Sequence, residues 1–171
     1  SLSLRVTRRF IEQLSVNGML GPLSTAIHTW GSPGIIIADN IDSLGGRITA
    51  ANPCVEQHLG SGETCLLASV NLPLLFNKGV KDGLARTGVA ASTAARLLCR
   101  ASQRSSFPDP DSAELALRAP RIGVGLTGWR SLCDDLEIPF GGGHALALAN
   151  DISQTISEAA HAEAAEERKV L

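Results

Sequence analysis

The chain has 171 residues, which is enough to bury the core of one domain. Its 15 basic and 17 acidic side chains give a net charge of −2, which indicates neither a basic surface for nucleic acid nor attraction to an anionic membrane. No stretch approaches the ~20 apolar residues needed to cross a bilayer. We therefore expect a soluble chain that binds neither nucleic acid nor a membrane.

The cysteines point to a reducing compartment. They are widely separated, without the close paired spacings of a zinc site or a disulfide framework, and they stand at Cys54, Cys65, Cys99 and Cys133. Such thiols suit the cytoplasm, where they are catalytic or buried. The first five residues lack the long apolar run of a signal peptide. The sequence predicts a cytoplasmic protein without a structural metal.

The first part of the chain predicts a strand followed by two helices. Residues 1–6 alternate between small and apolar side chains, as in a strand. Thr7 is suited to cap the helix that follows. Asn17-Gly18 and Gly21-Pro22 are expected to end that helix before a second short helix over residues 23–30.

A run of three isoleucines at positions 35–37 predicts a second strand, buried on both faces of a parallel sheet. Three polar residues follow it: Asp39, Asn40 and Asp42. Asp and Asn often bond to their own backbone in turns, which is the simpler interpretation here. A metal site is the weaker alternative, since three oxygen ligands without a glycine-rich calcium pattern prove little.

The most distinctive stretch is Asn52-Pro53-Cys54-Val55-Glu56, with Cys65 eleven positions after Cys54. The proline fixes its own φ and pushes the residue before it toward an extended conformation, so this stretch is a stiff turn. In an extended segment, side chains two positions apart lie on one side, which places the Cys54 sulfur beside the Glu56 carboxylate. Taken alone, these residues also fit a surface turn with an incidental cysteine.

The second half continues the alternation of strands and helices. We expect a strand over residues 66–75, a loop over 77–88, an alanine-rich helix over 89–102 and a proline-containing loop over 105–111. Cys99 on that helix is expected to be a small core residue.

A third strand is expected over residues 122–126, with nearby glycines that let a helix pack closely. Cys133 should lie in the core, on the helix that follows. A long helix over 144–168 then carries an apolar stripe, and His144 and His161 are expected to be solvated. The fold class predicted by this alternation is α/β with parallel strands.

Several segments resemble the large subunit of ribonucleotide reductase, in the same order along the chain. They are Ser32–Ile41, Asn52–Gln57, Gly62–Leu72, Arg121–Trp129 and Ile138–Phe140. The resemblance spans most of the chain and implies a fragment of that family's ten-stranded α/β barrel. Residues 1–171 would then be one partial catalytic barrel domain, with a central finger loop at about 48–66.

The resemblance also implies roles for four residues. Cys54 would be the thiyl radical that abstracts the 3′-hydrogen of a ribonucleotide. Glu56 would take the 3′-hydroxyl proton as general base, Asn52 would hold the ribose hydroxyls, and Cys65 would be one of two thiols that reduce C2′ and end as a disulfide.

The similarity is greatest to the class that uses adenosylcobalamin; the alternative radical source is a di-iron or di-manganese small subunit. Its implied partners are a ribonucleoside di- or triphosphate, a thioredoxin-type reductant and the missing segments of the barrel. We expect the isolated chain to be inactive. The alternative is a non-enzymatic remnant or interaction module that keeps the motif, because Val55 and Leu66 replace the family's usual small residue and asparagine.

Overall fold

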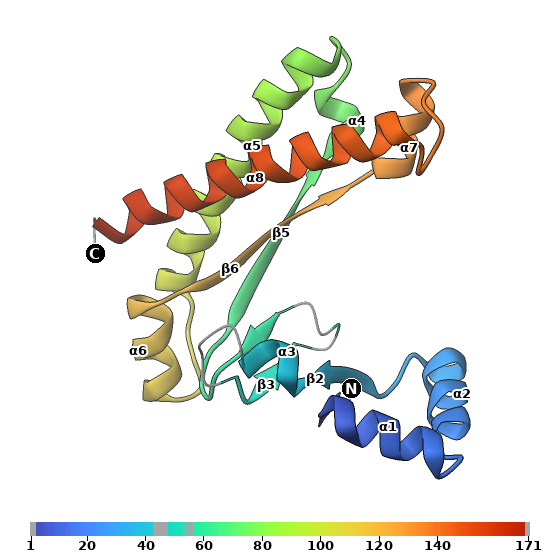
Figure 1. Ribbon diagram of the computed structural model, residues 1–171. Helices are drawn as coiled ribbons and strands as arrows, with labels where there is room; N and C mark the ends of the chain where they lie inside the picture. The colour runs from blue at the N-terminus through green and yellow to red at the C-terminus, as the bar shows by residue number, and fades with distance from the viewer. Residues whose placement is uncertain (1–2, 43–47, 53, 55–56, 170–171) are drawn as a thin grey trace. The chain divides into compact units, whose positions relative to one another are not determined.

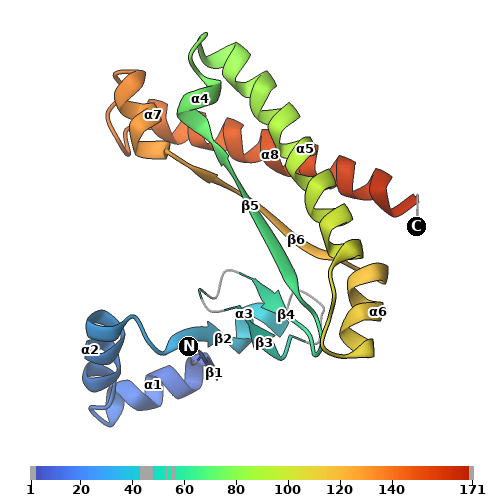
Figure 2. The same ribbon diagram turned by 180° about the vertical axis from the view of Figure 1, so that it is seen from behind.

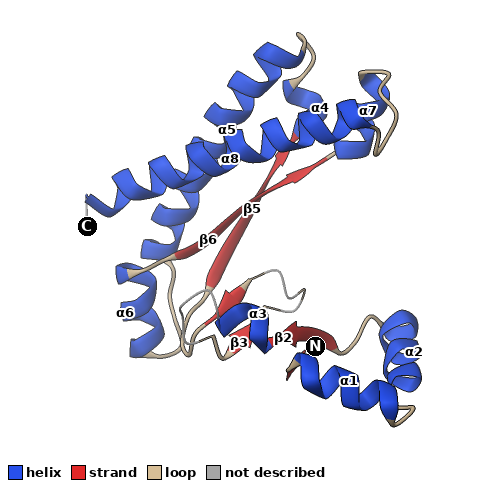
Figure 3. Cartoon of the chain, viewed as in Figure 1, coloured by secondary structure: helices blue, strands red, loops and turns tan. Residues whose placement is uncertain are grey.

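The computed structural model describes residues 3–42, 48–52, 54 and 57–169. Two compact units make up the chain, an N-terminal unit (Ser1–Glu63) and a C-terminal unit (Thr64–Leu171). Helices and strands alternate in both, which confirms the mixed α/β class (Figure 3). The described strands form three two-stranded sheets and no closed barrel. Within the described residues, no helix is both long and apolar enough to span a membrane.

The N-terminal unit begins with a parallel strand pair (Figure 1). Its elements are β1 (Ser3–Val6), α1 (Arg8–Val16), α2 (Leu20–Trp30), β2 (Gly34–Ile37), α3 (Ala38–Asp42), β3 (Ala50–Ala51) and β4 (His58–Leu59). β2 lies beside β1, and of the three isoleucines Ile36 is buried while Ile35 and Ile37 are half-buried. The predicted strand is confirmed, but its burial on both faces is not complete within this chain.

A side-chain cap explains where the first helix starts, and a proline marks the start of the second. The Thr7 hydroxyl accepts a hydrogen bond from the Phe10 backbone N–H at 3.2 Å, so the predicted cap of α1 is confirmed. Gly21 and Pro22, expected to end α1, instead lie in the first turn of α2. Proline is well tolerated there because the first helical N–H groups have no partner within the helix. The predicted helix end is confirmed at Asn17 and Gly18, because α1 stops at Val16 with Asn17 as its C-cap, and it is wrong only at Gly21 and Pro22.

The polar residues after β2 are bound to the start of α1. The Asp39 carboxylate accepts a hydrogen bond from the Arg8 backbone N–H at 2.8 Å, and Asn40 accepts one from the Arg8 guanidinium at 2.7 Å. Both residues lie in the short helix α3. Within the described part of the chain, no three His, Cys, Asp or Glu side chains gather as metal ligands.

The C-terminal unit is built on the parallel pair β5 and β6, which Figure 2 shows from behind. Its elements are β5 (Cys65–Asn71), α4 (Leu72–Leu75), α5 (Val80–Arg104), α6 (Pro110–Arg118), β6 (Arg121–Thr127), α7 (Trp129–Asp135) and α8 (Gly143–Lys169). Each strand is followed by a short helix and, further along the chain, by a long one: α4 and α5 after β5, and α7 and α8 after β6. The long helices α5 and α8 pack on one another. This is the order expected of consecutive strand–helix units in a parallel sheet.

The core of this unit lies between the strands and the long helices. Its buried members are Val70, Leu72, Phe76, Ala91, Leu132, Leu148, Ile152 and Ile156. The predicted apolar stripe of the last helix is thus confirmed at Leu148, Ile152 and Ile156. Cys99 and Cys133 are also buried, at 3% and 0% exposure, as the sequence predicts.

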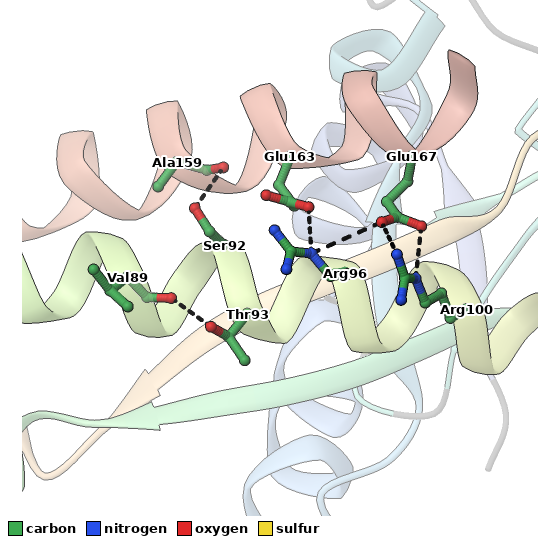
Figure 4. Close-up of polar contacts among 8 residues, drawn as sticks. All are labelled: Val89, Ser92, Thr93, Arg96, Arg100, Ala159, Glu163 and Glu167. Atoms are coloured by element: carbon green, nitrogen blue, oxygen red, sulfur yellow. Dashed lines mark hydrogen bonds and ion pairs between the residues drawn. The ribbon is translucent and has the colours of Figure 1, made fainter. Parts of the chain in front are cut away.

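Helices α5 and α8 run in the same direction, with matched side-chain contacts (Figure 4). The Ser92 hydroxyl donates to the Ala159 carbonyl at 3.4 Å. One turn further along, Arg96 binds Glu163, and after another turn Arg100 binds Glu167. Each pair is 67 positions apart along the sequence. This constant offset is expected when two parallel helices follow neighbouring parallel strands.

The ionic part of this interface centres on a largely buried carboxylate. The Glu167 side chain is 9% exposed, and its oxygens accept two hydrogen bonds from Arg100 at 2.9 and 3.0 Å. Arg96 donates to Glu163 at 2.7 Å, and this hydrogen bond lowers the pKa of Glu163. The stabilisation from that pair is complete above the ordinary pKa of glutamate and is lost as the pH falls through the lowered value.

Two predicted boundaries around β5 are wrong, for reasons visible in the packing. The strand expected over 66–75 stops at Asn71, because Pro73 has no N–H for a sheet and lies in the first turn of α4. The loop expected over 77–88 is mostly helix, since α5 begins at Val80. Gly83, which falls within the range expected to be a loop, lies in that helix against the ring of Phe76, where a Cβ atom would collide.

Helix α6 was missed by the sequence prediction, which assigned its first residues to a loop. The Asp109 side chain caps it by accepting a hydrogen bond from the Ser112 N–H at 2.8 Å, and Pro110 occupies the first turn. An aspartate followed by proline is a recognisable helix-start signal, so this element could have been found.

The glycines around β6 have different roles. A Cβ on Gly128 would lie 2.6 Å from Pro73 Cδ of α4, and its φ is +78°, so the expected close helix packing is confirmed there. At Gly125 a Cβ would make ordinary contacts of 3.8–3.9 Å with Ser69 and Ala68 of the neighbouring strand. Close packing of a helix therefore does not explain why position 125 is a glycine.

Candidate active site

Two residues of the distinctive cysteine motif, Asn52 and Cys54, lie between the strands of a short antiparallel hairpin formed by β3 and β4. Ala50 pairs with Leu59, and Ala51 pairs with His58. The Thr49 N–H also donates to the Leu59 carbonyl at 2.9 Å, which extends the pairing by one residue. The paired strands therefore end next to Asn52 on one side and Gln57 on the other.

Asn52 closes the turn of this hairpin. Its backbone N–H donates to the Gln57 carbonyl at 3.2 Å, and its side-chain oxygen accepts from the Gln57 N–H at 3.0 Å. These two bonds hold the ends of the turn together across five positions. One asparagine side chain therefore helps to set the position of the thiol two residues later.

Cys54 lies in this turn and is exposed, with a free thiol. The predicted turn is confirmed at Cys54, which lies between β3 and β4. Pro53, Val55 and Glu56 lie outside the described residues, so the predicted pairing of the Cys54 sulfur with the Glu56 carboxylate stays a prediction.

Cys65 is the first residue of β5, in the C-terminal unit, and its side chain is half-buried. Its thiol donates a long hydrogen bond to the Leu66 carbonyl at 3.6 Å. The preceding loop is held by Glu63, whose carboxylate accepts from the Gly60 N–H at 2.7 Å. The structure thus places Asn52 and Cys54 in one turn of the N-terminal unit, and Cys65 on a strand of the other unit.

One face of the β5–β6 pair, which we call the open face, carries Cys65. Side chains alternate along a strand, so Leu67, Ser69 and Asn71 share this face, and each of the three is exposed. Leu66, Ala68 and Val70 point to the other face, on which Val70 belongs to the buried core. The strand partners on the open face, in register order, are Arg121, Gly123, Gly125 and Thr127.

The remaining two cysteines do not belong to this site. Burial raises the pKa of the Cys99 thiol, and the negative charge of Glu167 adds to that shift, so Cys99 stays a neutral thiol. Cys133 is fully buried on α7. A pocket of about 530 Å³ lined by Glu114, Leu117, Arg118 and Arg168 includes none of the predicted site residues.

The sequence analysis missed two features of the C-terminal unit: the register of β5 with β6, and the ion pairs between α5 and α8. The register that places Arg121 opposite Cys65 joins positions 56 apart, and no local pattern indicates it. The ion pairs between α5 and α8 did carry a signal: Arg96 and Arg100 have the same spacing of four as Glu163 and Glu167. Matching charged pairs on two long helices is the pattern that reveals such a contact.

Comparison with known proteins places the chain in a family. The profile of the ribonucleotide reductase barrel domain matches residues 5–169. A protein of Mycobacterium tuberculosis (strain CDC 1551 / Oshkosh), named vitamin B12-dependent ribonucleoside-diphosphate reductase, is 32% identical over 160 residues, covering 91% of this chain and 23% of that protein. A protein of the same name from Thermoplasma acidophilum is 27% identical over 173 residues, covering 96% of this chain and 22% of that protein.

The chain spans less than a quarter of the length of these relatives. The match nevertheless runs through the cysteine hairpin, the β5–β6 pair and both long helices. The chain therefore belongs to the ribonucleotide reductase barrel-domain family.

Proposed function

We propose that this chain supplies part of the catalytic barrel of a ribonucleotide reductase, which converts a ribonucleotide to a deoxyribonucleotide by thiyl-radical chemistry. The observation that carries the proposal is the exposed thiol of Cys54 on the turn of a short hairpin, in a chain of this family. A turn presents a side chain beyond its two strands. Such a thiol is suited to reach a substrate held in front of it.

The proposed roles follow the chemistry of the ribose. Cys54, as the thiyl radical, takes the hydrogen from C3′, which activates the neighbouring carbon. Glu56 accepts the 3′-hydroxyl proton, which requires a carboxylate within hydrogen-bond reach. Asn52 holds the ribose hydroxyls while its side chain also helps to close the turn.

Cys65 supplies one of the two thiols that the reduction consumes. Replacing the 2′-hydroxyl by hydrogen takes two electrons and two protons: two thiols become one disulfide, and the hydroxyl leaves as water. Cys99 and Cys133 are buried in the core, so neither is suited to be the second thiol. That thiol belongs to a part of the barrel outside this chain, and a thioredoxin-type reductant restores the pair.

The proposed fold of the complete domain is the ten-stranded α/β barrel, with the finger loop at about residues 48–66 in its centre. Residues 1–171 would be one partial barrel domain within it. The parallel pairs β1–β2 and β5–β6 support this, since each has an edge to which further strands can be added. The proposed location is the cytoplasm, where the thiols remain reduced.

Adenosylcobalamin is the proposed cofactor, because the relatives are named vitamin B12-dependent. When bound, it supplies the radical that the reaction needs. An exposed free thiol on a turn, as at Cys54, fits a radical delivered from outside the hairpin. A di-iron or di-manganese small subunit is the alternative source. The same names favour a ribonucleoside diphosphate over a triphosphate as substrate.

A non-enzymatic remnant or interaction module is the second candidate. Val55 stands where the family has a small residue, and Leu66 stands where it has asparagine. A β-branched side chain beside Cys54 restricts how closely the backbone can approach a sugar. These two substitutions are the specific observations in favour of this candidate.

Reconstitution separates the two candidates. The chain is produced together with the barrel segments that lie on either side of it in the relatives, and deoxynucleotide is measured with adenosylcobalamin, dithiothreitol and a ribonucleoside diphosphate. We expect product from the combination and none from the chain alone, since the chain holds one of the two reducing thiols. A folded combination that makes no deoxynucleotide would favour the remnant.

A further inference from the structure

A pocket in the C-terminal unit is lined by residues from the C-terminal ends of α6 and α8. Its volume is about 530 Å³, and its lining residues are Glu114, Leu117, Arg118 and Arg168. The first three belong to the last five residues of α6, and Arg168 belongs to the last turn of α8. Two arginines from different helices therefore line one concave surface, together with one carboxylate.

Both helix ends are held on the C-terminal half of α5. The Ser102 hydroxyl donates to the Ala116 carbonyl of α6 at 3.3 Å, and both residues are buried. On α8, Glu167 accepts two hydrogen bonds from Arg100 at 2.9 and 3.0 Å (Figure 4). Each pocket arginine lies within two positions of one of these anchors, so both arginines extend from a fixed backbone.

Arg168 differs from the charged residues around it at the end of α8. Glu163 and Glu167 bind arginines of α5, and Glu166 binds Lys169 at 2.6 Å. Arg168 forms no ion pair with any residue in the part of the chain that the structure describes. Its positive charge is therefore available to a ligand in the pocket.

The other pocket arginine, Arg118, is held weakly by its neighbour on α6. A guanidinium nitrogen of Arg118 lies 3.8 Å from a carboxylate oxygen of Glu114, and both side chains are 74% exposed. Exposed pairs of this kind are weak, because water and salt screen their charges. A ligand with a larger negative charge can therefore replace Glu114 as the partner of Arg118.

The chemistry of the lining favours a phosphate group over a carboxylate. Guanidinium groups donate in a planar fork that fits the oxygens of either group. A single carboxylate offers Arg118 no more than Glu114 already does. A phosphate group carries a charge of about −1.5 to −2 at pH 7 and three acceptor oxygens, so it can accept from both arginines at once. Leu117, which is 48% exposed, adds an apolar surface for the rest of the ligand.

We propose that this pocket binds a ligand that carries a phosphate group, with Arg118 and Arg168 as the anion-binding residues and Glu114 as a competing carboxylate. The site is built on α6 and α8, whereas the proposed catalytic residues belong to the hairpin turn and to β5. The proposal therefore does not depend on the thiyl-radical chemistry, and each can fail without the other.

A titration of the 171-residue chain with inorganic pyrophosphate tests the proposal. Binding is followed by nuclear magnetic resonance, as shifts of the backbone amide signals of α6 and α8, at neutral pH and low ionic strength. We expect one saturable site at these two helix ends. Arg118→Gln and Arg168→Gln should each weaken binding by about tenfold, since each removes charge-assisted hydrogen bonds to the phosphate.

Two variants and a second anion make the result specific. Glu114→Gln should tighten binding by about threefold, because it removes the competing carboxylate. Arg130→Gln removes one positive charge from α7, where Arg130 pairs with Asp134 at 3.0 Å, and should leave binding unchanged. Succinate, a dicarboxylate, should bind more weakly than pyrophosphate.

Several results would overturn the proposal. One is the absence of saturable binding, and another is an unchanged affinity in Arg118→Gln or Arg168→Gln. An equal loss in Arg130→Gln would mean that only net charge matters. An unchanged or weaker affinity in Glu114→Gln would contradict the competition on which the argument rests. Equal binding of succinate and pyrophosphate would contradict the assignment of a phosphate ligand.

Discussion

We expect Cys54→Ser to abolish deoxynucleotide formation in the reconstituted enzyme. The loss should exceed about a thousandfold, equivalent to more than ~4 kcal/mol in the activation barrier. The physical reason is that a serine hydroxyl holds its hydrogen far more strongly than a thiol does, so the radical cannot be relayed through it. The measurement is the rate of deoxynucleotide formation from a ribonucleoside diphosphate, with adenosylcobalamin and dithiothreitol present.

Cys99→Ala is the matched control for this variant. It removes a thiol from the same chain, but one that is buried on α5 rather than exposed on a turn. Alanine is a strong helix former, so the helix should tolerate the change. Deoxynucleotide formation should continue in this variant. If Cys54→Ser also retains it, the assignment of the radical to Cys54 is wrong.

The second large effect is on stability. Ile152 is fully buried on α8, within the core that joins the long helices to the strands. Ile152→Ala removes buried methyl and methylene groups and leaves a cavity, so the free energy of unfolding should fall by about 2–5 kcal/mol. Chemical denaturation followed by circular dichroism measures this loss, with the midpoint shifting at an unchanged slope.

Leu146→Ala tests whether that cost comes from burial. Leu146 lies on the same helix but is 64% exposed, so its replacement should change the unfolding free energy by no more than about 0.5 kcal/mol. Similar losses in both variants would mean that α8 does not pack along the stripe described here.

Much of the fold followed from local patterns. Thr7 as a helix cap, the isoleucine run as a strand and the apolar stripe on α8 each reflect interactions within a few residues or along one face. Such signals depend on backbone geometry and periodicity, which a sequence shows directly. The turn at Cys54 was predictable for the same reason, since Pro53 restricts the residues around it.

Some of the errors concern residues whose role depends on a tertiary contact. Gly83 falls within the range expected to be a loop, yet it lies in α5, where the Phe76 ring leaves no room for a Cβ atom. The burial of Glu167 depends on its partner Arg100, which stands 67 positions earlier, and only the matched spacing of charges on the two helices indicates that pairing. The same limit applied to the site: the sequence identified Cys65, but the strand register that brings Arg121 beside it is a tertiary feature.

Exposed apolar side chains also have a tertiary explanation. Leu67 on the open face is 55% exposed, Leu74 on α4 is 66% exposed, and Leu97 on α5 is 65% exposed. The sequence predicts such surface for part of a barrel, because strands and helices that normally have neighbours are left without them.

The central claim is that Cys54 starts the reaction and Cys65 completes it. Free-base release by the two reconstituted serine variants tests this claim most directly, since base is lost when an activated nucleotide is not reduced. Cys65→Ser should release free base without forming deoxynucleotide, because Cys54 still activates the substrate and the disulfide-forming pair is incomplete. Cys54→Ser should release neither. Deoxynucleotide from Cys65→Ser, or free base from Cys54→Ser, would contradict the account.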